Sequence, residues 1–272
     1  METINVNVND IIEKFVDIMG YLDDEHVLGI IFYGSYLTGY NHKNSDIDLH
    51  IIYDNSEPDR IIRGVKFVDG IKIEYFEKPI EDIYESIDND FENQNSAFLP
   101  IIGKCRIIYD KDGSIHKLKE YTLDKYSDPL PKLDSDTAKE YVSIINNRME
   151  KLESAYENNS PYFTHLYHLT VEKIRKFYHK LNGISQIQTS KVFRLYKDKE
   201  YAKRFCEGNL PDETFIELYL DAAAADGLSK DEKYEKVSTL WEYSKRDVKL
   251  DNRNFRILIK SRNKTPKPDF ND

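Results

Sequence analysis

The stretch from Phe32 to Leu49 reads FYGSYLTGYNHKNSDIDL and decides how the first half of the chain is interpreted. It predicts the end of an apolar strand, a Gly-Ser turn, a short helix and a second strand that opens with Asp46 and Asp48. Side chains two residues apart in a strand point to the same face of a sheet, so these two carboxylates lie side by side. Such a pair repels itself unless a cation lies between the two groups, and oxygen ligands suit Mg²⁺. The pattern therefore indicates a metal site.

Two further features of the sequence suit the binding and reaction of phosphates. At Gly34 and Ser35 the chain turns without a Cβ in the way, so backbone N–H groups and a hydroxyl can approach a phosphate. Glu74 lies in the predicted strand Ile71–Phe76, which follows the hairpin signal Asp69-Gly70. If that strand neighbours the one with the aspartates, Glu74 adds a third carboxylate, and such a set is typical of phosphoryl transfer.

Apolar patterning on both sides of this stretch predicts a mixed sheet with flanking helices in the first half of the chain. Short apolar runs and the hairpin indicate strands, whereas apolar residues spaced by three and four indicate helices. The second half shows only helical spacing, so we expect an α+β protein whose C-terminal part is an all-α bundle. The expected strands cover residues 27–33, 46–53, 64–68, 71–76 and 105–109, and the expected helices cover residues 11–22, 80–87, 138–156, 163–181, 214–225 and 232–248.

The charge of the chain changes near Ser127–Lys132, a segment with two prolines that suits a linker. Residues 1–130 contain 26 acidic and 13 basic residues, whereas residues 131–272 contain 23 acidic and 26 basic residues. The net charge of the whole chain is −10. We therefore predict a head domain over residues 1–127, a helical substrate-binding bundle over residues 133–260 and a flexible tail over residues 261–272.

Composition excludes several other classes of protein. Of the 272 residues, 40% are hydrophobic, which is too many for a disordered or collagen-like chain. No apolar run approaches the roughly 18 residues that span a bilayer, and the N-terminus lacks the pattern of a signal peptide. The two cysteines, Cys105 and Cys206, argue against a disulfide framework and favour a cytoplasmic protein. The acidic head argues against binding along a long nucleic acid, and no membrane partner is expected.

The pattern of Gly34-Ser35, ten intervening residues, Asp46-x-Asp48 and the later acid Glu74 resembles the DNA polymerase β-like nucleotidyltransferase superfamily. An α/β head followed by a helical bundle is similar to the streptomycin/spectinomycin adenylyltransferases and lincosamide nucleotidyltransferases. This resemblance covers residues 8–126, including the end of the head at Arg106–Gly113. It implies transfer of a nucleoside monophosphate, above all AMP from ATP, to a hydroxyl of a small molecule.

The same resemblance implies roles for the three acids. Asp46 and Asp48 would bind Mg²⁺, with two ions expected in the site. Glu74 would be either a further metal ligand or the general base that takes the proton of the acceptor hydroxyl. Its spacing from the aspartates is shorter than in some relatives, so both roles stay open.

The resemblance also implies how the nucleoside triphosphate is bound. Gly34 and Ser35 would hold its phosphates. A predicted helix ends near Leu181-Asn-Gly183, and Lys191 follows it in the sequence. By this position Lys191 would reach the triphosphate. The alternative is that Lys191 is a solvent-exposed lysine with no role in nucleotide binding.

A run of acids in the second half bears on the acceptor. Residues 207–226 contain six acidic residues and no basic one. Glu213 and Glu217 are four residues apart and share one helix face, where like charges are unfavourable without a compensating cation. They predict contact with a polycationic acceptor such as an aminoglycoside, and the alternative is a solvated helix face.

Two alternative functions are compatible with the same sequence features. In the first, the acceptor is a hydroxyl of a protein, as in AMPylation or a toxin–antitoxin pair. A non-catalytic, antitoxin-like interaction module predicts a damaged motif, whereas every acid of the motif is present. The oligomeric state is left open.

Overall fold

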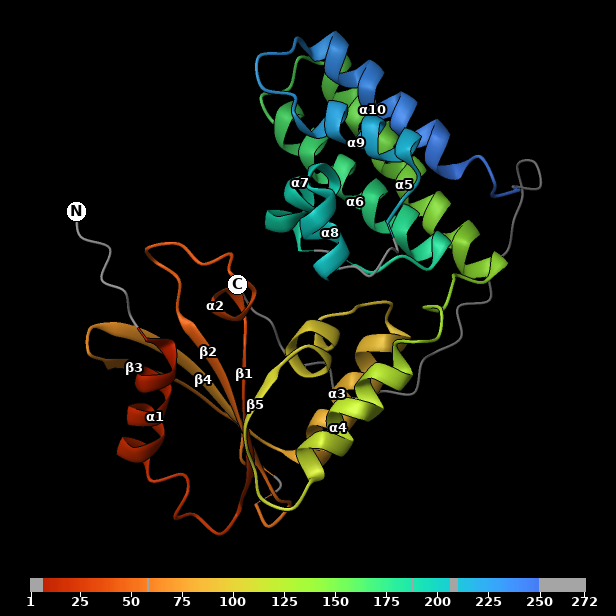
Figure 1. The fold of residues 1–272 in the computed structure, drawn as a ribbon. Coiled ribbons are helices and arrows are strands. Elements are labelled where there is room, and N and C mark those ends of the chain that lie inside the picture. Colours follow the sequence, from red (N-terminus) through yellow and green to blue (C-terminus); the bar gives the residue numbers. More distant parts are fainter. Residues whose placement is uncertain (1–6, 58, 187, 206–209, 250–272) are drawn as a thin grey trace. The chain divides into compact units, whose positions relative to one another are not determined.

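The computed structural model describes residues 7–57, 59–186, 188–205 and 210–249 (Figure 1). The predicted tail over residues 261–272, the end of the predicted bundle and Cys206 lie outside these ranges. The chain forms two compact units, Met1–Lys132 with Gly183–Leu210 and Leu133–Asn182 with Pro211–Asp272.

The grouping of Gly183–Leu210 with the first unit differs from the single bundle expected over residues 133–260. Long-range contacts explain it. The backbone N–H of Gln186 donates to the carbonyl oxygen of Gln94 at 2.9 Å, and a Cβ at Gly183 would lie 2.7 Å from the carbonyl oxygen of Leu130. These contacts join residues far apart in sequence, so no local pattern predicts them.

A five-stranded mixed sheet forms the centre of the first unit. Its strand order is β3-β4-β2-β1-β5, which makes β3 and β5 the edge strands. The central strand β2 pairs antiparallel with β1 and parallel with β4, and β3 and β5 each pair antiparallel with their neighbours. The strands are β1 Val27–Tyr33, β2 Ile47–Tyr53, β3 Ile62–Val68, β4 Ile71–Pro79 and β5 Arg106–Asp110.

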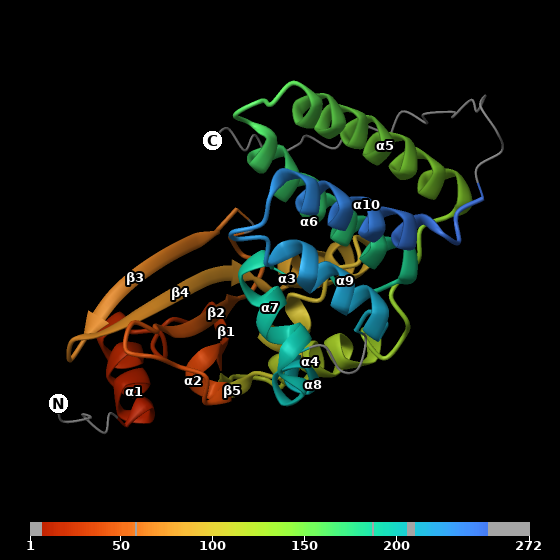
Figure 2. The same cartoon turned by 90° about the horizontal axis from the view of Figure 1, so that it is seen from above.

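Helices cover the two faces of the sheet unequally (Figures 1 and 2). One apolar core lies between the sheet and α1 and includes Phe15, Ile47 and Leu49. A second core, which includes Ile52 and Ile115, lies on the opposite face beneath α3, η1 and α4. The helical segments of this unit are α1 Val8–Met19, α2 Ser35–Thr38, α3 Ile80–Glu92, η1 Leu99–Gly103, α4 Ser114–Lys125, α7 Thr189–Lys197 and α8 Lys199–Phe205.

All regular secondary structure in the described residues of the second unit is helical. Its long helices bury aromatic side chains such as Tyr167, Phe177 and Trp241. Asp134 caps one helix, and Ser229 with Glu232 forms a capping box at another. The helices are α5 Ser135–Glu157, α6 Phe163–Asn182, α9 Glu213–Ala223 and α10 Lys230–Lys245. The mixed sheet and this helical region confirm the predicted α+β class.

None of the helices in the described part of the chain combines the length and the apolar character needed to cross a membrane.

A buried ion pair ties the edge strand β3 to the rest of the sheet. Glu77 of β4 is only 4% exposed and accepts hydrogen bonds from Arg60 Nε at 3.0 Å and from Nη2 at 2.7 Å. Tyr21 donates to the same carboxylate at 2.8 Å, and Arg60 also lies over the ring of Tyr53. Because Arg60 lies two residues before the first residue of β3, the pair holds the start of that strand against β4.

Replacing Arg60 by leucine is expected to lower the free energy of unfolding by about 3–5 kcal/mol, because it leaves a buried carboxylate without its cation. The matched control is Lys14→Leu, which breaks the pair with Asp69; both side chains there are 56% exposed, and a loss below about 1 kcal/mol is expected. Urea unfolding of both variants at neutral pH measures the difference. Equal small losses would contradict a structural role for the Arg60–Glu77 pair.

Candidate active site

The turn after β1 requires a glycine at position 34. Its backbone has φ 87° and ψ −162°, a region that residues with a Cβ rarely adopt. A Cβ there would lie 2.0 Å from Oδ2 of Asp48, so a side chain would also displace that carboxylate. Ser35 follows as the first residue of α2. The glycine therefore lets the turn and the carboxylate of Asp48 lie against each other.

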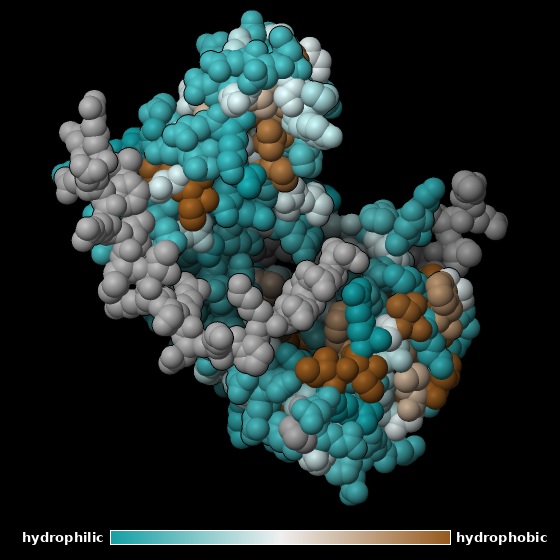
Figure 3. Space-filling model, turned by 180° about the vertical axis from the view of Figure 1, so that it is seen from behind, coloured by the Kyte–Doolittle hydropathy of each residue, from teal (hydrophilic) through white to brown (hydrophobic). Residues whose placement is uncertain are grey.

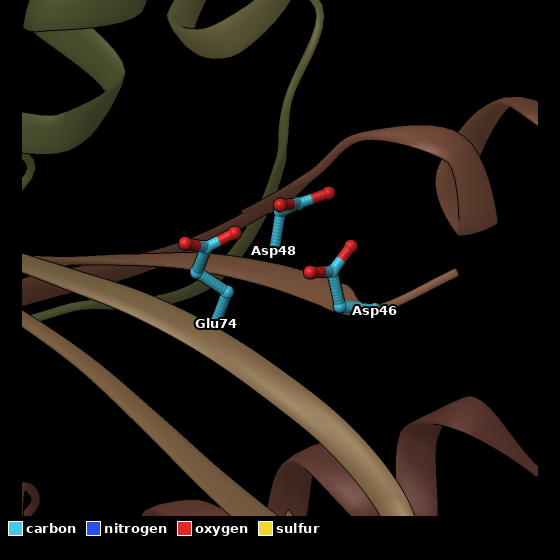
Figure 4. Close-up of side chains that lie close together, drawn as sticks. All are labelled: Asp46, Asp48 and Glu74. Carbon is cyan, nitrogen blue, oxygen red and sulfur yellow. The ribbon is translucent and has the colours of Figure 1, made fainter. Parts of the chain in front are cut away.

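Asp46, Asp48 and Glu74 lie together on one face of the sheet (Figure 4). Asp46 immediately precedes β2, Asp48 lies within it, and Glu74 is the register partner of Asp48 in the parallel strand β4. One carboxylate oxygen from each residue lies within 4.8 Å of the other two. Their neighbours Ile47 and Leu49 point to the opposite face, into the core beneath α1. The strand that carries Glu74 is thus the neighbour of β2.

Two cationic side chains from β3 and β4 contact this carboxylate cluster. Lys72 Nζ donates to Asp46 Oδ2 at 2.8 Å. Arg63 Nε donates to Glu74 Oε1 at 2.8 Å, and its guanidinium lies over the ring of Phe76. Neither residue was predicted from the sequence. The available signal was that Lys72 lies two residues before Glu74 on the same strand face, and that Arg63 lies diagonally across the hairpin from Glu74, as the register partner of Phe76.

The electrostatics of the cluster are dominated by its own negative charge. The pKa of Asp48 is raised to about 7, first by burial and then by the charges of Asp46 and Glu74, while Lys191 and Lys72 act in the opposite direction. Burial is the largest single influence on the pKa of Asp46 and acts to raise it, but the hydrogen bond and charge of Lys72, together with a backbone hydrogen bond, lower that pKa overall. A cation added at this cluster therefore favours the ionised form of Asp48.

The donor set fits a divalent metal ion. Three carboxylates converge, and oxygen ligands of this kind are those that Mg²⁺ binds. Tyr33, the register partner of Asp48 in β1, is largely buried beside them, and burial together with the three negative charges raises its pKa. The hydroxyl of Tyr33 thus stays protonated at neutral pH. Only the three acids supply anionic ligands among these residues.

Lys191 belongs to the same unit as the cluster and lies exposed in α7. Its positive charge is one of those that lower the pKa of Asp48. A cation–π contact joins this segment to Tyr40, which follows α2. The guanidinium of Arg194 lies 4.3 Å from the ring centroid of Tyr40 and 4.4 Å from that of Tyr201. The structure thus brings the α7–α8 segment to the loop that follows Gly34.

Glu213 and Glu217 lie in the second unit, on α9, and both are exposed. Glu213 is the first residue of that helix, where a negative charge is favourable. Asp221, the next acid on the same face, pairs with Lys236 of α10. The acidic face is therefore partly compensated within the second unit.

The raised pKa of Asp48 predicts how the stability of the metal-free protein depends on pH. An acid whose pKa is 3.8 unfolded and about 7 folded is destabilising once it ionises, so its cost grows between pH 4 and pH 7 and is constant above. Asp48→Asn removes this cost, and its melting temperature in EDTA should exceed that of the wild type increasingly over that window. Calorimetry at pH 4.5, 6 and 7.5 checks this.

Excess Mg²⁺ at pH 7.5 should reverse the order, because a cation favours the ionised carboxylate that the variant lacks. A melting-temperature difference that is independent of pH and of Mg²⁺ would contradict the electrostatic account of Asp48.

Comparison with known proteins gives a family match for the part of the chain that contains the carboxylate cluster. The family model described as "Nucleotidyltransferase domain" matches residues 12–98. No curated protein matches the sequence. A solved structure described as a nucleotidyltransferase-like protein from Exiguobacterium sibiricum 255-15 is similar at a TM-score of 0.49 and 9% sequence identity, over 88% of this chain and 75% of that chain. That likeness is too weak to indicate function.

The matched stretch begins in α1 and ends just before η1, so it contains the whole sheet except β5. Gly34, Ser35, Asp46, Asp48 and Glu74 all fall within it. The match supports the broad superfamily resemblance but not membership of the antibiotic-modifying group. Residues 12–98 thus match a nucleotidyltransferase domain, and the carboxylate cluster lies inside that match.

Proposed function

We propose that the protein transfers a nucleoside monophosphate, AMP from ATP in the first instance, to a hydroxyl of a small molecule. The observation that carries this proposal is the cluster of Asp46, Asp48 and Glu74 beside the Gly34 turn, within the matched nucleotidyltransferase domain. Acids that hold a divalent cation next to a turn whose backbone N–H groups can bind phosphate are the parts that phosphoryl transfer needs.

The three acids would hold Mg²⁺, which supplies charge neutralisation of the phosphates and activation of the attacking oxygen. Backbone N–H groups at Gly34 and Ser35 would bind the phosphates, with Lys191 as a further cation for the triphosphate. In the chain itself, Lys72 and Arg63 already supply positive charge to Asp46 and Glu74. We expect the metal ion to compete with these two side chains.

The reaction is an in-line displacement at the α-phosphorus. The acceptor oxygen forms a new bond to this phosphorus, and the bond from the phosphorus to the oxygen of pyrophosphate breaks. Glu74 takes the proton of the acceptor hydroxyl if it is the general base.

The aminoglycoside-type acceptor remains a proposal that rests on Glu213 and Glu217. Both carboxylates are exposed on α9, where a polycation could bind them. Asp221 is less available because it pairs with Lys236.

Glu74→Gln tests the role of the third acid. If Glu74 is the general base, transfer should slow by roughly 10²–10⁴-fold while the affinity for Mg·ATP is kept. Pyrophosphate release from ATP with aminoglycosides, spectinomycin and lincosamides measures the rate, and calorimetry measures the affinity. Asp46→Asn is the control and should lose both.

Loss of Mg·ATP affinity in Glu74→Gln would instead make Glu74 a metal ligand. If the wild type releases no pyrophosphate with any nucleoside triphosphate and any hydroxyl acceptor, the proposed transfer is contradicted.

The pair Glu213→Gln and Glu217→Gln tests the polycation. Combined, the two changes should raise the KM for an aminoglycoside severalfold and leave the KM for ATP unchanged, because only the acceptor would contact this face. The effect should weaken as salt rises. Lys191→Ala is the matched control with the opposite pattern, a higher KM for ATP alone. Unchanged acceptor kinetics in the double variant would show that the acidic face is merely solvated.

A further inference from the structure

The face of the sheet that carries the three acids continues onto the edge strand β3. In the antiparallel pairing of β3 with β4, Val65 is the register partner of Glu74, and Phe67 is the partner of Lys72. Register partners in a sheet point to the same face, with Cβ atoms about 4.5–5.5 Å apart. Val65 therefore lies directly beside Glu74, on the side away from Asp48.

Val65 and Phe67 form an apolar surface that is open to solvent, and we call these two residues the β3 shelf. Val65 is 51% exposed and Phe67 is 67% exposed, whereas the next residue, Val68, is buried in the core on the opposite face. Figure 3 shows that brown hydrophobic patches of this kind are few among the teal hydrophilic residues on the face that it draws. Edge strands more often carry charged residues here, so exposed apolar side chains at such a position suggest a binding role.

The order of the strands matches the order of the reacting groups in the proposed transfer. Across the sheet from β1 to β3 come the phosphate turn at Gly34, the metal-binding acids of β2, Glu74 of β4 and then the β3 shelf. In an in-line displacement the leaving group and the attacking oxygen lie on opposite sides of the phosphorus. With the phosphates on the β1 side, the acceptor approaches from the β3 side.

We infer that the acceptor is a hydroxyl compound with an apolar face next to the reacting hydroxyl, and that this face packs on Val65 and Phe67. The inference rests on the proposed nucleotidyl transfer. A hydroxyl within reach of Glu74 must lie about 2.6–3.2 Å from its carboxylate, which sets the adjoining part of the molecule over its neighbour Val65. An aromatic ring or alkyl group is the chemistry that this surface binds.

The experiment uses two probes that carry the same sugar hydroxyls, phenyl β-glucoside and methyl β-glucoside. Binding to the full-length protein is followed by NMR in the presence of Mg²⁺ and α,β-methylene-ATP, which cannot react. The phenyl glucoside should bind at least about tenfold more tightly, because several apolar carbons leave water. Binding of the phenyl glucoside should shift the NMR resonances of the Val65 methyl groups.

Phe67→Ser should abolish the preference for the phenyl probe while leaving the affinity for the nucleotide analogue unchanged. The matched control is Ile18→Ser, which removes an apolar side chain that is 58% exposed on α1 and should keep the preference. An equal affinity for both probes, or a preference that survives in Phe67→Ser, overturns the inference. The inference is also overturned if analytical ultracentrifugation shows that the wild type is a dimer and that Phe67→Ser is a monomer, because a second copy of the chain then covers the β3 shelf.

Failure of the proposed function gives a different result. In that case binding of the nucleotide analogue does not depend on Mg²⁺ or on Asp48, whatever the two glucosides do. If the wild type binds the nucleotide analogue in a Mg²⁺-dependent way but shows no preference for the phenyl glucoside, the role of the β3 shelf alone is contradicted.

Discussion

Repulsion among three carboxylates is the constraint on which the rest of the site depends. The parallel pairing of β2 with β4 brings Asp46, Asp48 and Glu74 together, with one carboxylate oxygen of each within 4.8 Å of the other two. Lys72 and Arg63 offset part of the charge, yet the pKa of Asp48 is still raised to about 7. Without a metal ion, this arrangement lowers the free energy of unfolding. Functional sites typically carry such a cost in stability.

The scaffold around the acids is built to maintain that closeness. The α1 side of the sheet buries Ile47 and Leu49, which commits the alternate residues of β2 to the other face. Gly34 leaves room for Asp48, and the Arg60–Glu77 pair anchors the edge strand that carries Arg63 and the β3 shelf. The proposed binding of phosphate, metal and acceptor is thereby distributed over neighbouring strands in one sheet, so small changes in register would disturb all three.

Much of this could be predicted from the sequence because the signals are local. The apolar run at Val27–Tyr33 became β1 with the same ends, and the Asp69-Gly70 turn joins β3 to β4 as expected. The helix Ser114–Lys125 was missed because its amphipathic pattern is weak, with Ile115 and Leu118 as its main buried apolar residues. The contacts of Lys72 and Arg63, and the packing of Arg194 on Tyr40, join segments that are separate in sequence, so they required the structure.

The central claim is that the three acids bind the metal that serves nucleotide transfer. The most direct measurement is a crystal structure with Mn²⁺ and α,β-methylene-ATP, in which anomalous scattering locates the metal. The account predicts Mn²⁺ bound to Asp46 and Asp48, with Glu74 beside it and phosphate oxygens at the backbone N–H groups of Gly34 and Ser35. Manganese bound elsewhere, or a nucleotide bound away from this turn with Asp46 and Glu74 still paired with Lys72 and Arg63, would contradict it.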